Sequence, residues 1–230
     1  MDVRRFVGIV GIAVAVAAAA GCGELPAVGE PAPGTPVPGD EVSAQQVATA
    51  EAQLAKLAVR PAREGGYQRT RHFGPAWSVD VDRNGCGTRD DVLRRDLTKV
   101  QLRGRCTVVA GVLADPYTGR TVTFAKADAD AVQVDHLVPL AAAWSLGARD
   151  WPQATRERFA NDPVNLQATT ASANLGKGDD TPAEWLPRQG YRCAYAVRWI
   201  GVSTRYKLAV TPADRATLGS LLRGCPAGRR

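Results

Sequence analysis

Residues 134–140 have the sequence VDHLVPL, residues 161–166 have NDPVNL and residues 174–177 have NLGK. The stretch that they span places an Asp-His pair at the end of an apolar run, then an Asn-Leu pair. A second Asn follows nine residues further on, with a Lys three residues after it. The side chains therefore supply, in order, a carboxylate, an imidazole, amides and an amine. This set predicts a base, a cation site and a phosphate contact in one place.

His136 is the candidate base, because an imidazole with an ordinary pKa of about 6.5 is largely neutral at pH 7 and accepts a proton. Asp135 supplies a carboxylate for a hard cation, and Asn174 adds an amide oxygen from a facing helix. Neighbouring side chains on a regular strand point to opposite faces, so Asp135 and His136 share a cavity only where the strand ends or bulges. Such oxygen ligands favour Mg²⁺, with Mn²⁺ and Ca²⁺ as alternatives.

Two further residues complete this predicted site. Asn165 is expected to bridge backbone groups across the loop and to hold the strand of His136 in position. Lys177 lies three residues after Asn174, on the same face of a helix, where its ammonium group can contact a phosphate. A base, a cation and a phosphate contact are what phosphodiester hydrolysis requires, although each pair alone also fits an ordinary surface.

The first segment of the chain predicts export. Residues 1–21 combine two early arginines with an apolar run over residues 6–20, as a secretory signal peptide does. Cys22 follows small residues, as in the lipobox of bacterial lipoproteins, and this predicts lipidation and anchoring to the outer face of the cell membrane. A transmembrane anchor is the alternative, but the apolar run is shorter than the ~20 residues that a spanning helix needs.

The mature chain is expected to have three parts. Residues 22–42 are rich in proline and glycine and predict a linker, because such a segment buries too little apolar surface to fold. Residues 43–64 predict an N-terminal helix with Ser43 as its N-cap and Pro61 beyond its end. Residues 65–230 then form the catalytic domain.

Four cysteines remain after Cys22, and an even number in an exported chain predicts two disulfides. We favour the local pairs Cys86–Cys106 and Cys193–Cys225 among the three possible connectivities. Zinc is the competing interpretation, but the cysteines and histidines do not have the spacing of a zinc site.

An acidic loop over residues 80–91 is a possible second cation site. Asp80, Asp82, Asn84 and Asp91 occupy positions 1, 3, 5 and 12 of an EF-hand-like pattern, with a glycine at position 6. Position 12 is an aspartate where a glutamate is usual, and no helix is expected before Asp80. The alternative is a turn that Cys86 ties down.

The remaining patterns predict an α+β domain. Thr88 is expected to cap a helix that continues to Leu97, and two strands with a Pro/Gly turn between them form a hairpin. A further strand then delivers Asp135 and His136. The expected strands span residues 106–113, 120–125 and 132–137, and the later helices span residues 140–146, 152–159, 168–175, 191–200 and 212–222.

Three short motifs of the chain resemble those of the HNH, or His-Me finger, nucleases. They are Asp135-His136 with Pro139, then Asn165-Leu166, and then Asn174 with Lys177. The segments TRDDVL, FANDPVNL and EWLP are similar to the secreted HNH branch of high-GC Gram-positive bacteria, and the resemblance covers about residues 65–225. It implies a ββα-metal core with additional helices and a β-hairpin. It also implies that His136 is the general base, that Asp135 and Asn174 hold the metal, and that Asn165 orients the loop. Asn174 stands where the family name has its second histidine, and the segment between His136 and Asn165 is long for a minimal motif.

These observations predict an exported, monomeric endonuclease that acts on nucleic acid, with DNA as the preferred substrate. The formal net charge of +6 suits a polyanion. The alternative is a non-catalytic lipoprotein that binds nucleic acid or a cell-wall polymer. Other hydrolase classes are disfavoured, because the sequence has no G-x-S-x-G, H-E-x-x-H or Walker motif.

Overall fold

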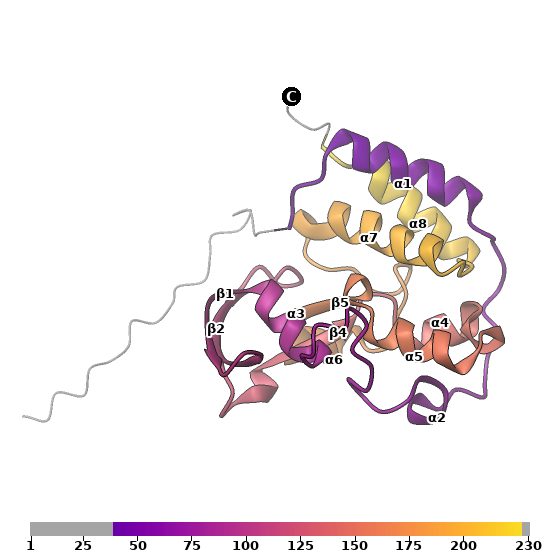
Figure 1. Cartoon of the computed structure of the whole chain (residues 1–230). Helices are drawn as coiled ribbons and strands as arrows, with labels where there is room; N and C mark the ends of the chain where they lie inside the picture. Colours follow the sequence, from indigo (N-terminus) through magenta and orange to yellow (C-terminus); the bar gives the residue numbers. More distant parts are fainter. Residues whose placement is uncertain (1–38, 227–230) are drawn as a thin grey trace, which may run out of the picture.

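The computed structural model describes residues 39–226, and its elements form a helical layer above a mixed lower part (Figure 1). Helices α1, α7 and α8 pack together in the upper layer, with α7 toward the strands. Two small antiparallel sheets and the other helices lie below. In chain order the elements are α1 (Ala44–Lys56), α2 (Arg69–Phe73), α3 (Thr88–Asp96), β1 (Leu97–Arg103), β2 (Thr107–Ala114), β3 (Thr121–Ala125), β4 (Val132–His136), α4 (Leu140–Leu146), α5 (Gln153–Asn161), β5 (Leu166–Thr170), α6 (Ala171–Lys177), α7 (Arg192–Arg205) and α8 (Pro212–Arg223).

The element that positions the predicted site is the pair β4–β5 with the helix α6 directly after it. The two strands are antiparallel, with His136 opposite Leu166 and Asp135 opposite Gln167. The Thr170 side chain then accepts a hydrogen bond from the Ala173 amide and caps α6, which is why the chain changes from strand to helix at this point. The result is a strand, a long connection, a second strand and a helix.

Several expected elements are present. Helix α1 has a capping box in which Ser43 and Gln46 bond to each other's backbone amides. The expected hairpin is β2–β3, paired in register from Ala110 with Ala125 to Ala114 with Thr121. The expected strand before Leu137 and the helices over residues 140–146, 152–159, 191–200 and 212–222 correspond to β4, α4, α5, α7 and α8.

Two expectations about local structure are wrong, and one strand was missed. The helix expected over residues 168–175 begins only at Ala171, because residues 166–170 form β5. Strand β1 was not expected, and its residues continue directly from α3 into the edge of the three-stranded sheet. Thr88 does not cap α3, because it is the first residue of that helix and its hydroxyl donates to the Val79 carbonyl.

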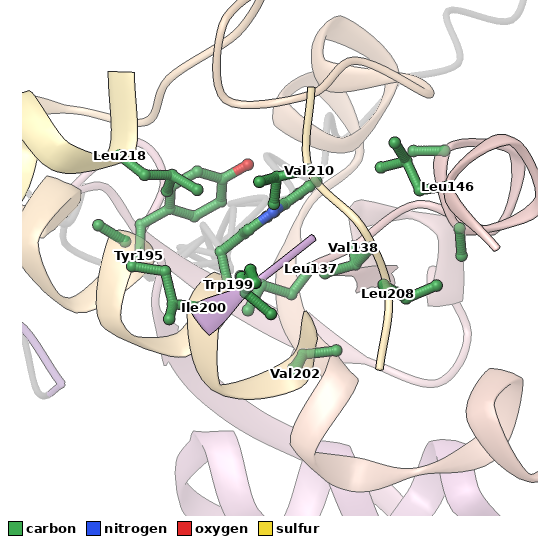
Figure 2. Packing of buried hydrophobic residues seen from close by; sticks show 14 of the residues in the cluster. Leu137, Val138, Leu146, Tyr195, Trp199, Ile200, Val202, Leu208, Val210 and Leu218 are labelled. Carbon is green, nitrogen blue, oxygen red and sulfur yellow. The ribbon is translucent and has the colours of Figure 1, made fainter. Parts of the chain in front are cut away.

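Two apolar clusters fix the segment around His136, one through residues before it and one through residues after it. The larger cluster contains Leu137 and Val138 together with Trp199 and Ile200 of α7, and Leu137 lies beside Trp199 in Figure 2. The smaller cluster joins α3 to the sheets through buried side chains that include Val134 and Leu166. Burying each large apolar side chain contributes about 1.5–3 kcal/mol, so packing from both sides fixes the segment that carries His136.

The N-terminal helix shares the larger cluster. Ala50, Leu54 and Leu57 are buried in it, and Val59 pairs with Val210 as an isolated parallel bridge. Helix α1 is therefore packed into the same core as α7 and α8. No helix within residues 39–226 is long and apolar enough to cross a membrane.

The structure contains the two disulfides that were favoured from the sequence. Cys86–Cys106 joins the acidic loop to the turn between β1 and β2. Cys193–Cys225 joins the start of α7 to the residues after α8. The predicted signal peptide, the linker up to residue 38 and the lipidation of Cys22 lie outside the described residues.

Replacing Cys193 and Cys225 together by serine should destabilise the helical layer. The disulfide closes a loop over a sequence separation of 32 residues, and losing it should cost about 3–4 kcal/mol through the entropy of the unfolded chain. Urea unfolding followed by circular dichroism measures this as a lower midpoint. An unchanged midpoint, with the Cys86–Cys106 disulfide shown by mass spectrometry to be intact, would contradict the prediction.

Candidate active site around His136

His136 ends β4, and its ring is fixed by the backbone of α5. The Nε2 atom lies 2.8 Å from the Ala160 carbonyl oxygen. A carbonyl oxygen only accepts hydrogen bonds, so Nε2 carries the ring proton and Nδ1 keeps a free lone pair. Within residues 39–226, Nδ1 has no hydrogen-bond partner, and it is not among the polar atoms sealed from solvent. The imidazole is thus oriented to accept a proton at Nδ1.

The surroundings of His136 keep the imidazole neutral. Burial lowers the pKa of His136 to about 4, because the charged form loses its hydration. The hydrogen bond to the Ala160 carbonyl opposes this shift, whereas the positive charges of Arg69 and Lys177 add to it. The ring is therefore an unprotonated base throughout the neutral pH range.

Asp135 points away from solvent and is bonded on both oxygens. Oδ1 accepts from the Lys177 ammonium at 2.9 Å, and Oδ2 accepts from the Tyr117 hydroxyl at 2.7 Å. Burial raises the pKa of the Asp135 carboxyl, and Lys177 and Tyr117 act in the opposite direction. The same ammonium donates to the His136 carbonyl oxygen at 2.9 Å, so Lys177 fixes α6 to the end of β4.

The expected role of Lys177 as a phosphate contact does not fit this arrangement. Its side chain is 0% exposed and its ammonium is committed to Asp135 and to the His136 backbone. The spacing of Asn174 and Lys177 does place both side chains against β4. However, that face of α6 is packed on the strand, so it is not the face that meets solvent.

Asn165 has the geometry that was expected of a residue that holds the loop. Its side chain is buried, with Oδ1 accepting from the Val138 amide at 2.9 Å and Nδ2 donating to the Val138 carbonyl at 3.2 Å. Its own carbonyl accepts from the Leu137 amide at 2.8 Å. These three bonds fix the two residues that follow His136, and a catalytic effect of Asn165 through them stays a prediction.

Asp135 and Asn174 do not form a cation site in this arrangement. The Asn174 amide donates to Gln133 at 2.7 Å, two residues before Asp135 on β4. Both Asp135 oxygens are used, and a cation could bind there only after displacing the ammonium of Lys177. Across residues 39–226, no group of three or more His, Cys, Asp or Glu side chains is placed to hold a metal ion. The residue types suit a hard cation, but their placement does not.

The acidic loop over residues 80–91 does not gather its carboxylates as a cation site either. The side-chain nitrogen Nδ2 of Asn84 donates to Asp82 at 2.9 Å and to Asp91 at 3.0 Å. The backbone amide of Gly85 donates to Asp80 at 2.7 Å. The side-chain amide of Asn84 thus turns its donor, and not its oxygen, toward two of the carboxylates. These bonds favour the turn that was the alternative, and a calcium site in this loop stays a prediction.

Three residues near the site were not found from the sequence. Tyr117 in the β2–β3 turn reaches Asp135, and Ala160 acts only through its carbonyl. Trp77 lies with its ring parallel to the imidazole of His136, at 6° between planes and 6.2 Å between centroids. The Tyr in a Pro/Gly turn and the Arg-rich aromatic segment before Trp77 were weak signals, whereas a backbone carbonyl leaves no signal in a sequence.

Residues 87–220 match the family of the C-terminal domain of GmrSD restriction endonucleases, which is HNH-like. The matched segment is more than half of the chain, so the protein belongs to this family. It includes β4, β5 and α6 with all of the residues from Asp135 to Lys177. The HNH resemblance is therefore supported at the level of the family, and the bacterial branch stays a prediction.

A fungal relative extends the similarity beyond this domain. The chain is 42% identical to an uncharacterized secreted protein of Arthroderma benhamiae over 181 residues, which covers 77% of this chain and 85% of the relative. No solved structure matches the chain.

The buried pair of Asp135 and Lys177 can be tested by a double-mutant cycle. Lys177→Met should destabilise the fold by about 3–5 kcal/mol, because it leaves a buried carboxylate without its counter-charge. The double variant with Asp135→Asn should recover part of this loss, since no unpaired charge remains. Urea unfolding gives the coupling energy. Additive single and double effects would show that the pair does not interact in solution.

Proposed function

We propose that this protein is an exported endonuclease that hydrolyses phosphodiester bonds of nucleic acid, with DNA as the preferred substrate. Membership in an HNH-like endonuclease family supports the class of reaction. The observation that carries the proposal is the state of His136: its Nε2 is held by a carbonyl, its Nδ1 is free, and its pKa of about 4 keeps it neutral.

In the proposed reaction, Nδ1 of His136 accepts a proton from a water molecule. The water oxygen forms a bond to phosphorus while the bond from phosphorus to the leaving oxygen breaks. The leaving oxygen takes a proton from solvent, and the imidazolium then returns its proton to solvent. Ala160 keeps the ring in the required tautomer, and the Asn165 bonds keep the backbone after His136 in place.

A divalent cation belongs to the proposal as an expectation from the family, with Mg²⁺ first and Mn²⁺ or Ca²⁺ as alternatives. Such an ion would stabilise charge on the phosphate and on the leaving oxygen. Asp135 and Asn174 are the residues expected to hold it, but their present partners do not fit, so no step is assigned through the ion.

The proposed location of the protein is extracellular. Its two disulfides and its secreted relative support this location. Cleavage of a signal peptide after residue 21, a lipid on Cys22 and a monomeric state remain parts of the proposal. The competing proposal is a protein that binds nucleic acid without cleaving it. Cleavage that depends on His136 distinguishes the two, because binding alone requires no base.

His136→Ala should abolish nicking of supercoiled plasmid DNA, because it removes the only group proposed to accept the proton from water. The assay is run in parallel with EDTA, Mg²⁺, Mn²⁺ and Ca²⁺, so that it also decides metal dependence. His72→Ala is the matched control, since His72 stacks on Trp144 and lies outside the proposed chemistry. If the wild-type protein retains DNA on a filter but never nicks it, the binding protein is the correct alternative.

The pH dependence of cleavage should follow the lowered pKa of His136. A base is active only when deprotonated, so kcat/KM should stay level from about pH 8 to about pH 5 and fall as the pH drops through about 4. An ordinary histidine would already lose activity near pH 6.5, at about its unperturbed pKa. Initial rates on a short oligonucleotide, with folding checked by circular dichroism at each pH, separate the two profiles.

A further inference from the structure

Trp77 is held in an unusual backbone conformation at the edge of the His136 site. Its φ angle is +59°, which a bulky non-glycine residue rarely adopts because of steric strain. Its ring is half-buried, packs against the smaller apolar cluster and is parallel to the imidazole. The surrounding structure therefore holds the indole in one fixed orientation beside the proposed base.

The N–H of the Trp77 indole has no partner in the described part of the chain, although one part of the ring packs against the smaller apolar cluster. Within residues 39–226 its N–H makes no hydrogen bond, and it is not sealed from solvent as the N–H of Trp199 is. Trp144 differs, because its ring stacks on the imidazole of His72 at 3.9 Å between centroids and has Arg149 and Arg156 over it. Trp77 thus has aromatic surface available to a ligand, whereas Trp144 is already engaged.

Arg69 is an uncommitted cation beside the same site. Its side chain is exposed and makes no hydrogen bond or ion pair to any residue in the described part of the chain. Its positive charge is nevertheless close enough to lower the pKa of His136. Two other arginines are engaged, since Arg63 pairs with Asp150 and Arg156 donates to the His72 carbonyl, whereas Arg71 on the same helix as Arg69 is also exposed. A guanidinium without a partner next to a proposed phosphodiester base is suited to a phosphate group.

An open aromatic ring and a free guanidinium together match a single-stranded nucleic acid. Bases of any identity stack on aromatic side chains, and positive side chains follow the backbone phosphates. A base lying on the indole would also be parallel to the imidazole, because the two rings are parallel to each other. Bases in a closed duplex are already stacked on their neighbours and must leave the helix to reach such a ring.

We propose that Trp77 is a stacking platform for an unpaired base next to the cleaved bond and that Arg69 binds the adjoining phosphate, so that this site selects single-stranded or locally unpaired nucleic acid. The inference rests on the proposed nuclease function. It adds the form of the substrate and names the two residues that recognise it.

The test compares a single-stranded DNA oligonucleotide with a closed hairpin duplex of the same sequence. Wild-type protein should cleave the single strand faster. Trp77→Ala should lower kcat/KM for the single strand about tenfold to a hundredfold, as expected for the loss of one stacked base, with much less effect on the duplex. Trp77→Phe should restore most of the rate, and Trp144→Phe is the control for an aromatic residue that is already engaged.

Abasic nucleotides introduced one at a time along the single strand test the contact directly. One abasic position should slow the wild-type protein as much as Trp77→Ala does, and the same abasic substrate should slow Trp77→Ala no further. This comparison needs a folded variant, which thermal unfolding checks, and Trp77→Leu, which keeps an apolar side chain but has no aromatic ring, serves in its place if the alanine variant does not fold. Independent, additive losses from the missing base and the missing indole would overturn the inference.

Arg69→Ala should weaken binding of the single strand and reduce its salt dependence, measured in the His136→Ala background so that cleavage does not interfere. Equal cleavage of single strand and duplex by the wild-type protein, with equal effects of Trp77→Ala on both, would remove this inference and leave the nuclease proposal standing. Absence of cleavage on every substrate would instead remove the nuclease proposal.

Discussion

The buried carboxylate of Asp135 is the interaction on which the site depends. It accepts hydrogen bonds from Lys177 at the end of α6 and from Tyr117 in the β2–β3 turn, and it thereby joins both to β4. Burying two charges is expensive, and breaking such a pair leaves one charge uncompensated. Tyr117 in turn is placed by Asp115, a buried carboxylate that also accepts from the hydroxyls of Thr169 and Thr170. Two buried carboxylates thus connect the hairpin to both strands and to the helix of the motif.

The long connection between His136 and Asn165 has a function of its own in this arrangement. Helix α5 brings the Ala160 carbonyl to Nε2, and Asn165 at the end of the connection fixes the backbone just after His136. A histidine at the end of an exposed strand would keep a pKa near its ordinary value and would not favour one tautomer. Burial under α5 supplies both the lowered pKa and the free Nδ1, so the inserted residues help to make His136 a base.

The sequence predicted helices and strands better than the contacts between side chains. Spacing and capping signals located β4, the hairpin and most helices, because each of these has a local pattern. Strand β5 was missed because all five of its residues are buried, so it has no alternation of apolar and polar side chains. The burial of Lys177 could not be predicted, since helical spacing puts Asn174 and Lys177 on one face without saying whether that face meets solvent or β4. The orientation of His136 depends on a backbone carbonyl, which no residue type reveals.

The charges around His136 indicate how a phosphate could be held there. Asp135 and Lys177 cancel each other inside the fold, the imidazole is neutral, and the exposed guanidinium of Arg69 adds positive charge on the solvent side. A single phosphodiester carries one negative charge, so the side chains alone offer a matching counter-charge at low cost in desolvation. A divalent cation bound at Asp135 would release the ammonium of Lys177 from its present partner. The ammonium could then reach a phosphate only if α6 moved away from β4. The free energy needed to break the Asp135–Lys177 pair therefore reduces the affinity of the site for such an ion.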